Sequence, residues 1–228
     1  MRKTLLFVLC SLLFCVSLPI RADGEISSQI VGVSLRWDGN DKKFVLQADP
    51  ASPALTNVTP ASLQEIPLLA ERLSATDITV SVLAMLRLSR SGDRAVAALH
   101  EVVKWEGGIA RGKAAAVLLA IGTKSAFAAV RNIPLKTLQA DIDANDGLQR
   151  FTSGLLLAFR GGKEANEIVR AMLRNDDYYE LHGAVLLGAA VGHQKALLPD
   201  IEQCLRSTDA QTRMQAVFSY GVLRGRKA

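Results

Sequence analysis

The chain has 228 residues, of which 49% are hydrophobic, 21% charged and 5% aromatic. This composition is typical of a globular protein and excludes disordered and collagen-like chains. Lys and Arg number 27 against 22 Asp and Glu, and three of the bases lie in the first 22 residues. The remainder therefore carries 24 − 22 = +2, which gives no electrostatic reason to expect nucleic-acid binding.

Residues 1–22 have the pattern of an export signal. Two basic residues precede an apolar run from Leu5 to Val16, and Ala22 supplies a small residue for cleavage. We expect a periplasmic or secreted protein, cleaved near Ala22, with no membrane span left after cleavage. The alternative is that the segment stays attached as an anchor.

Cys204 is the one cysteine that remains after this cleavage, so no internal disulfide can form. It lies beside Ile201 and Leu205 in a helical pattern. This setting favours a buried structural thiol over a catalytic nucleophile.

Residues 23–55 predict a β-hairpin segment and a linker. Apolar residues alternate with polar ones on both sides of the turn-forming residues Asp38–Asp41: Val31, Val33, Leu35 and Trp37 before it, and Phe44, Leu46 and Ala48 after it. Two prolines, Pro50 and Pro53, then mark the linker. A lone hairpin is marginally stable, so we expect it to pack on the rest of the chain or on a partner sheet.

Residues 56–228 predict a domain of repeated helices. Capping residues begin successive helices at Asp77, Asp146, Asn175–Asp177 and Asp209. Between them we expect second helices at about 92–104, 123–131, 163–174 and 194–206, with turns at Gly92, Gly122, Gly161–Gly162 and Gly192. Two helices every 30 to 39 residues are typical of an α-solenoid.

The strings NDDYYELHGAVLLGAAVGHQKALLPDIEQCL and STDAQTRMQAVFSYGVLRGRKA resemble HEAT-like repeats. The matching positions are Asp176, Glu180, Gly183 and Gly188 in the first string and Asp209, Arg213, Ala216 and Gly221 in the second. The resemblance covers roughly residues 76–225 and weakens toward the first unit. It implies a mainly α fold, a solenoid of about four and a half helical pairs, and no particular activity.

The last predicted helix has two faces. Ala210, Met214, Val217, Phe218 and Gly221 form an apolar stripe, which we expect to pack on the preceding unit. Gln211, Gln215 and Ser219 form a polar stripe, which we expect to face solvent as the cap of the array. The small residues Ala184, Gly188 and Ala216 are expected to let neighbouring helices approach closely.

Two motifs suggest ligand binding. Residues 107–114, GGIARGKA, fit the spacing of a phosphate loop, but Ala114 stands where Mg²⁺ binding needs Ser or Thr. Asp141, Asp143 and Asn145 have the spacing of calcium ligands. The alternative is a helix start after the long connection 132–145, without metal.

The sequence predicts no catalytic residues and no cofactor. His100, His182 and His193 have no second ligand three or four residues away, so no zinc site is expected. No Ser stands in a G-x-S-x-G motif either.

Six residues are candidates for partner binding. Lys163, Glu167, Arg170 and Arg174 share one face of a second helix, and Tyr178 and Tyr179 stand at a helix start. The alternative is a solvated face with ion pairs within the helix, and ordinary packing of the tyrosines. We expect an exported, non-enzymatic scaffold for an envelope or secreted protein partner. The alternative function is an enzyme or enzyme accessory, because some HEAT-like proteins act as lyases.

Overall fold

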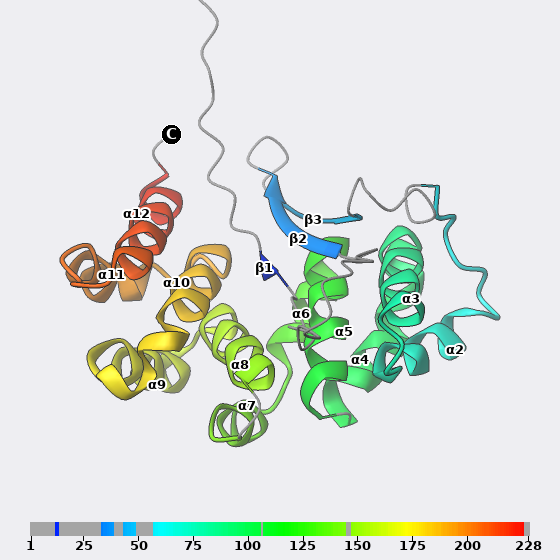
Figure 1. Cartoon of the computed structure of the whole chain (residues 1–228), viewed down its shortest axis with the longest axis horizontal. Helices are drawn as coiled ribbons and strands as arrows, with labels where there is room; N and C mark the ends of the chain where they lie inside the picture. The colour runs from blue at the N-terminus through cyan, green and yellow to red at the C-terminus, as the bar shows by residue number, and fades with distance from the viewer. Residues whose placement is uncertain are drawn as a thin grey trace, which may run out of the picture. The chain divides into compact units, whose positions relative to one another are not determined.

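The computed structural model describes residues 12–13, 33–38, 43–48, 57–105, 107–144 and 147–225. Over these residues the protein is mainly helical, as the composition and periodicity predict (Figure 1). None of the helices in these ranges is long and apolar enough to cross a membrane. The predicted signal peptide, apart from Leu12–Leu13, and the predicted linker after residue 48 lie outside the described residues.

The chain divides into two compact units, which are described separately. The first unit holds the described residues up to Trp105 together with Lys113–Phe127. The second unit holds Gly107–Gly112 and the described residues from Ala128 onward.

Three short strands in the first unit form an antiparallel sheet in the order β1-β2-β3. They are β1 (Leu12–Leu13), β2 (Val33–Asp38) and β3 (Lys43–Ala48). The register of β2 and β3 pairs Val33 with Ala48 at one end and Asp38 with Lys43 at the other. β1 lies within the segment that signal cleavage would remove, whereas β2 and β3 lie beyond it.

The first unit also holds the helices α2 (Ile66–Glu71), η1 (Arg72–Ser74), α3 (Ile78–Arg90), η2 (Gly92–Ala95) and α4 (Val96–Trp105), with most of α5 (Gly108–Ile121) and the start of α6 (Lys124–Arg131). Asp77 caps α3, because its carboxylate accepts hydrogen bonds from the backbone N–H groups of Thr79 and Val80 at 2.8 and 3.3 Å. Leu73, Leu88 and Leu99 are fully buried and form part of the core.

The second unit holds α7 (Leu135–Ile142), α8 (Gly147–Arg160), α9 (Lys163–Arg174), η3 (Asp176–Leu181), α10 (His182–Val191), η4 (Lys195–Leu197), α11 (Leu198–Cys204) and α12 (Ala210–Arg224). Helices α8, α10 and α12 lie side by side with α10 in the middle, while α7 packs on α8 and α11 on α12 (Figure 1). Helix α10 is buried almost all round because it contacts both neighbours of this row.

Close approach of α8 and α10 depends on Gly188, as its small size predicts. A Cβ atom at this position would lie 2.1 Å from the carbonyl oxygen of Leu155. Gly192 has the same role one turn later, where a Cβ atom would lie 2.5 Å from the carbonyl oxygen of Phe159. Backbone atoms cannot move aside as a flexible side chain can, so these two positions require glycine.

The helix starts and the second helices fall close to their predicted positions. The ranges expected at 92–104, 123–131, 163–174 and 194–206 correspond to η2 with α4, to α6, to α9 and to η4 with α11. Asp209 caps α12 by accepting a hydrogen bond of 2.6 Å from the backbone N–H of Thr212. Asn175 caps η3 by accepting one of 3.0 Å from the N–H of Asp177.

The connection 132–145 differs from the prediction, because it contains helix α7. Pro134 stands at its N-cap position with φ −59°, a backbone angle that proline fixes and a helix can follow. Leu138 and Ile142 are four residues apart and only 0% and 4% exposed. A short helix with this spacing buries both side chains on one face.

Helix α12 buries a different face from the one predicted, although Gln211 of the predicted polar stripe is exposed as expected. Gln215 and Ser219, expected to face solvent, are 8% and 0% exposed, whereas Met214 and Val217, expected in the core, are 42% and 64% exposed. The hydroxyl of Ser219 donates a hydrogen bond of 2.8 Å to the carbonyl oxygen of Leu186 in α10. Short polar side chains fit the close contact between α10 and α12, so this face packs inward.

Candidate functional site

The four charged candidates on α9 divide into two pairs. Lys163 and Glu167 are exposed. Arg170 places Nε 3.2 Å from Oδ2 of Asp200 in α11, and Arg174 places Nη2 2.7 Å from Oδ1 of the same carboxylate. The two arginines therefore hold α9 to α11, and the predicted face is partly a structural ion-pair cluster rather than a wholly solvated surface.

Asp200 is only 5% exposed, so its carboxylate needs both arginines to compensate its burial. The side chain of Arg174 remains 62% exposed, which leaves part of its guanidinium group at the surface. Burial, with a smaller contribution from Asp200, raises the pKa of Cys204. A buried thiol whose pKa is raised is a poor nucleophile, which agrees with the structural role predicted for this cysteine.

The two tyrosine candidates in η3 differ in exposure. Tyr178 is half-buried, and its φ of −108° breaks the regular helical backbone. Tyr179, the next residue, is 64% exposed. Of the two, Tyr179 therefore presents an accessible aromatic ring, of the kind that anchors protein interfaces.

The first calcium candidate, Asp141, belongs to a buried network in the last turn of α7. It is 7% exposed, and its Oδ2 is ion-paired with Nη1 of Arg111 and accepts a hydrogen bond of 3.2 Å from the Ser153 hydroxyl. Its Oδ1 accepts a hydrogen bond of 2.6 Å from Nε2 of Gln149. Burial lowers the pKa of Arg111, because a guanidinium cation is less stable away from water.

These contacts compete with calcium for the Asp141 carboxylate. Asp143 follows α7 and is exposed, and Asn145 lies outside the described residues. The part of the chain that the structure describes holds no cluster of three or more His, Cys, Asp or Glu side chains suited to a metal ion.

The GGIARGKA segment forms a helix instead of a phosphate loop, since α5 begins at Gly108. The amine of Lys113 donates hydrogen bonds to the carbonyl oxygen of Leu73 at 3.1 Å and to the Ser81 hydroxyl at 3.0 Å. Burial lowers the pKa of Lys113. The lysine therefore ties α5 to the neighbouring helices of the first unit.

The three histidines lie in unrelated places. His182 is buried in α10, with Nε2 3.0 Å from the carbonyl oxygen of Met172. His193 is exposed after α10 in a left-handed conformation with φ 55°, and His100 is half-buried in α4.

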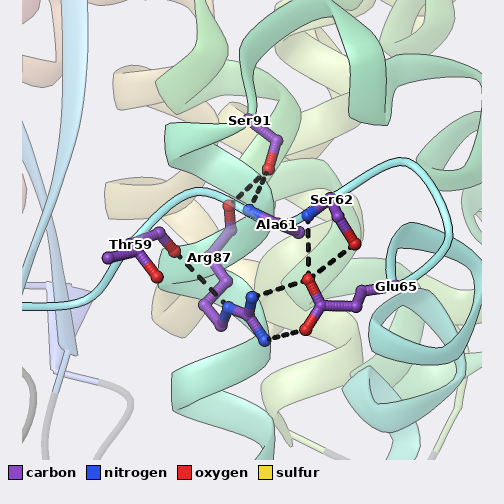
Figure 2. A network of polar contacts seen from close by, with 6 residues as sticks. All are labelled: Thr59, Ala61, Ser62, Glu65, Arg87 and Ser91. Carbon is purple, nitrogen blue, oxygen red and sulfur yellow. Dashed lines mark hydrogen bonds and ion pairs between the residues drawn. The ribbon is translucent and has the colours of Figure 1, made fainter.

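Figure 2 shows a polar network in the first unit that sequence reasoning missed. The guanidinium of Arg87 in α3 binds Glu65 through two parallel contacts, Nη1 to Oε1 at 2.9 Å and Nη2 to Oε2 at 2.8 Å. Glu65 Oε2 also accepts hydrogen bonds of 2.8 Å from the backbone N–H and the hydroxyl of Ser62. The Arg87 and Ser62 contacts together lower the pKa of Glu65 to about 2.

The same network fixes the segment that leads into α2. The Arg87 Nε donates to the carbonyl oxygen of Thr59 at 3.4 Å, and the N–H of Ala61 donates to the Ser91 hydroxyl at 2.8 Å (Figure 2). That hydroxyl in turn donates to the carbonyl oxygen of Arg87 at 2.8 Å. The contacts hold residues 59–65 against the end of α3, which is a structural role.

A second carboxylate in the first unit joins two turns. Oδ1 of Asp93 accepts hydrogen bonds of 2.5 Å from the hydroxyls of Thr123 and Ser125. These two bonds, with Ser125 contributing more, lower the pKa of Asp93. The cluster links η2 to the start of α6.

Large apolar side chains reach the surface of both units. They are Leu63, Leu68, Leu83 and Trp105 in the first unit, and Ile109, Tyr179, Met214 and Val217 in the second. Trp105, at 71% exposed, is the most accessible of these. Its indole N–H donates to Glu101 at 2.8 Å, and the Lys104 amine lies 4.6 Å from its ring centre.

Comparison with known proteins identifies no family. No protein-family model matches the chain, and no curated protein matches it significantly. Among solved structures, two crystal structures of engineered proteins from the Northeast Structural Genomics Consortium are similar to it. Each is 17% identical with a TM-score of 0.44 and covers 77% of this chain, which corresponds to 89% of one engineered chain and 91% of the other.

Proposed function

We propose that the chain is an exported scaffold that binds an envelope or secreted protein partner. It is built as a short β-hairpin followed along the chain by a HEAT-like α-solenoid. The observation that carries the proposal is that three Arg–acid ion pairs of the described residues each join residues 30 positions apart, while Arg87–Glu65 and Arg174–Asp200 span 22 and 26. Arg111 pairs with Asp141, Arg150 with Glu180 and Arg170 with Asp200.

A recurring spacing is what a repeat array produces. In such an array each repeat contacts the next, so a residue meets partners about one repeat further along the chain. The first of the two compact units has the same spacing, since Thr123 bonds Asp93 and Ala61 bonds Ser91, each pair 30 residues apart. These contacts support the repeat architecture that the resemblance to HEAT-like proteins implies.

Repeat arrays commonly bind partners through extended surfaces, and this chain offers side chains suited to that use. Tyr179 is a large exposed aromatic residue, and the exposed side chains of Lys163 and Glu167 lie on α9 of the same unit. Strand β3 stands at the edge of the described sheet and supports a mode in which a partner strand pairs with it. The basic and apolar pattern of residues 1–22 supports export.

Export is tested by N-terminal sequencing of the native protein. The expected first residue is Asp23 or a close neighbour, whereas Met1 on the mature protein contradicts export with cleavage.

Partner binding is tested by site-specific photo-crosslinking in the source organism. A photoreactive phenylalanine analogue at Tyr179 is expected to capture one partner reproducibly. The same analogue at Lys136, an exposed residue of α7 in the same unit, serves as the control and is expected to give no such product. Equal products at both positions, or none at either, contradict the proposal.

A further inference from the structure

We propose that the outer face of α12, formed by Met214, Val217 and Gly221, is a docking site for an amphipathic helix of a partner protein that carries acidic residues along one flank. This inference rests on the proposed interaction function and names a surface and a class of partner for it.

The outer face is opposite the buried face of the same helix. Met214 is 42% and Val217 64% exposed, and a Cβ atom on Gly221 would meet nothing within 4 Å. On the other side, Ala216 and Ser219 are fully buried against the row of helices. Two large apolar side chains beside an open glycine leave a step in the helix surface that another helix can fill.

The way in which α8, α10 and α12 pack side by side in the second unit indicates that a helix would fit the outer face of α12. A Cβ atom on Gly188 would meet the carbonyl oxygen of Leu155 in α8, and Ser219 bonds the carbonyl oxygen of Leu186 in α10. Equivalent positions of α10 and α12 therefore differ by 219 − 188 = 186 − 155 = 31, and not by the 33 residues that separate Gly188 from its predicted counterpart Gly221. On α10, a Cβ atom at Gly183 would lie 3.7 Å from Cγ of Gln215 in α12, and the carbonyl oxygen of Leu186 accepts the hydrogen bond from Ser219.

Adding 31 to these two positions gives 214 and 217. Met214 and Val217 therefore occupy on α12 the places that α12 itself covers on α10, and they are exposed. The surface that receives a helix on α10 is thus repeated on α12.

Charge selects the kind of helix. Arg213 and Arg224 are exposed and, eleven residues or about three turns apart, lie on the same flank of the outer face. The Arg224 guanidinium lies 4.9 Å from the centre of the Tyr220 ring, on this flank. Arg213 is held at the start of the helix, where Nη1 donates hydrogen bonds of 2.8 Å to the carbonyl oxygens of Ser207 and Thr208. The hydrogen bonds from Thr212 and, to a smaller extent, the charge of Arg213 lower the pKa of Asp209. Arg224 stands at the other end of the helix, and no Asp or Glu occurs between Ala210 and Arg224. A partner helix with carboxylates along the facing flank complements this surface.

The same charges disfavour a second copy of this chain. When two identical helices pair in antiparallel fashion, like flanks face each other, so Arg213 of one copy would approach Arg224 of the other. Asp209 beside Arg213 offsets part of this repulsion, whereas an acidic partner helix meets both arginines with opposite charge.

The test uses the purified native protein and two synthetic amphipathic helical peptides. Both peptides carry the same leucine and alanine stripe, one with glutamate and the other with lysine along one flank. By fluorescence anisotropy we expect the glutamate peptide to bind at least tenfold more tightly than the lysine peptide. Equal affinities, or no binding of either, overturn the proposal.

Variants locate the site. Val217→Asp is expected to weaken binding of the glutamate peptide at least tenfold, and Arg224→Glu to remove the preference for glutamate over lysine. Leu68→Asp, at a 49% exposed position of α2, is the matched control and is expected to leave binding unchanged. If Leu68→Asp weakens binding as much as Val217→Asp, the site is not on α12. Met214→Gln provides a second variant if Val217→Asp fails to fold.

Two outcomes separate this proposal from the proposed function. Concentration-dependent dimers in sedimentation that Val217→Asp abolishes would show that a second copy occupies the face, which overturns the inference. A partner captured at Tyr179 without peptide binding at α12 overturns this inference alone and leaves the scaffold function supported.

Discussion

The hydroxyl of Ser219 in α12 donates a hydrogen bond of 2.8 Å to the backbone carbonyl oxygen of Leu186 in α10. Ser219 is fully buried, so α12 uses its polar stripe to pack and leaves Met214 and Val217 exposed. One hydrogen bond between two closely packed helices thus marks the face of α12 that joins the core. The exposed apolar face follows from it, because the two faces lie on opposite sides of the helix.

Changing Ser219 tests this orientation. Ser219→Ala removes the hydrogen bond and is expected to lower the free energy of unfolding by about 1 kcal/mol. Ser219→Leu also overpacks the contact and is expected to cost about 1–3 kcal/mol or more. Urea unfolding followed by circular dichroism measures both. The control is Val217→Ala at a 64% exposed position, expected within about 0.5 kcal/mol of wild type. A Ser219→Leu variant as stable as wild type would mean that this side chain faces solvent.

Local signals predicted most of the helices. Caps such as Asp77 and Asp209, and glycine turns, act over a few residues, so sequence spacing is enough to place helices near them. The face that α12 buries depends on its neighbour. Helix α10 lies so close to α12 that the Ser219 hydroxyl reaches the backbone carbonyl oxygen of Leu186, and short side chains such as Ser219 and Ala216 fit this contact.

The polar clusters of the candidate site were less predictable, because they join residues that are distant along the chain. The pattern Ser62-x-x-Glu65 is that of a capping box, and it signals the local contact between these two residues. Their partner Arg87 lies 22 residues after Glu65 on another helix, a distance that no local rule fixes. Likewise, the charged face of α9 was visible in the sequence, but the binding of Arg170 and Arg174 to Asp200 required the packing of α9 on α11.

Gly188 and Gly221 form a matched pair of glycines within helices. Gly188→Ala places a Cβ atom 2.1 Å from the carbonyl oxygen of Leu155, and we expect a loss of about 3 kcal/mol or more in the free energy of unfolding. Gly221→Ala meets open space and is expected to raise stability by about 0.5–1 kcal/mol, because alanine favours the helix. Urea unfolding of both variants checks the opposite signs, and a stabilising Gly188→Ala would contradict the close contact of α8 and α10.

The Glu65–Arg87 pair predicts a loss of stability in acid. Its contacts lower the pKa of Glu65 from 4.5 to about 2 in the folded protein, while the unfolded chain keeps the ordinary value. The unfolded state therefore binds the proton more readily. The stabilising contribution is complete above about pH 4.5 and is lost as the pH falls toward 2. We expect Glu65→Gln to lower the urea midpoint at pH 7 and to flatten its decline between pH 5 and 2.

Glu71→Gln is the control for this titration. Glu71 is an exposed carboxylate of the same helix, α2, and its replacement should leave the decline of the urea midpoint in acid as steep as in wild type. Identical acid profiles for wild type and Glu65→Gln would show that another group controls the acid sensitivity of this protein.

The buried pair Arg111–Asp141 and the partly exposed pair Arg150–Glu180 span the same 30 residues and are expected to differ in energy. Asp141→Ala leaves the Arg111 cation in a site where burial already lowers its pKa, so we expect a loss of about 3–5 kcal/mol. The Glu180 side chain is 49% exposed, so Glu180→Ala is expected to cost less than about 1 kcal/mol.

The double variant Arg111→Met, Asp141→Leu separates the cost of removing one charge of the pair from the value of the pair itself. Two apolar side chains need no compensation, so we expect the double variant to recover most of the stability that Asp141→Ala loses. Guanidinium unfolding of Asp141→Ala and of the double variant measures the two losses. If the double variant is as unstable as Asp141→Ala, the ion pair itself, together with the Gln149 and Ser153 bonds to Asp141, supplies the stability of this part of the second unit. Recovery instead shows that the pair is needed because each charge would be costly without the other.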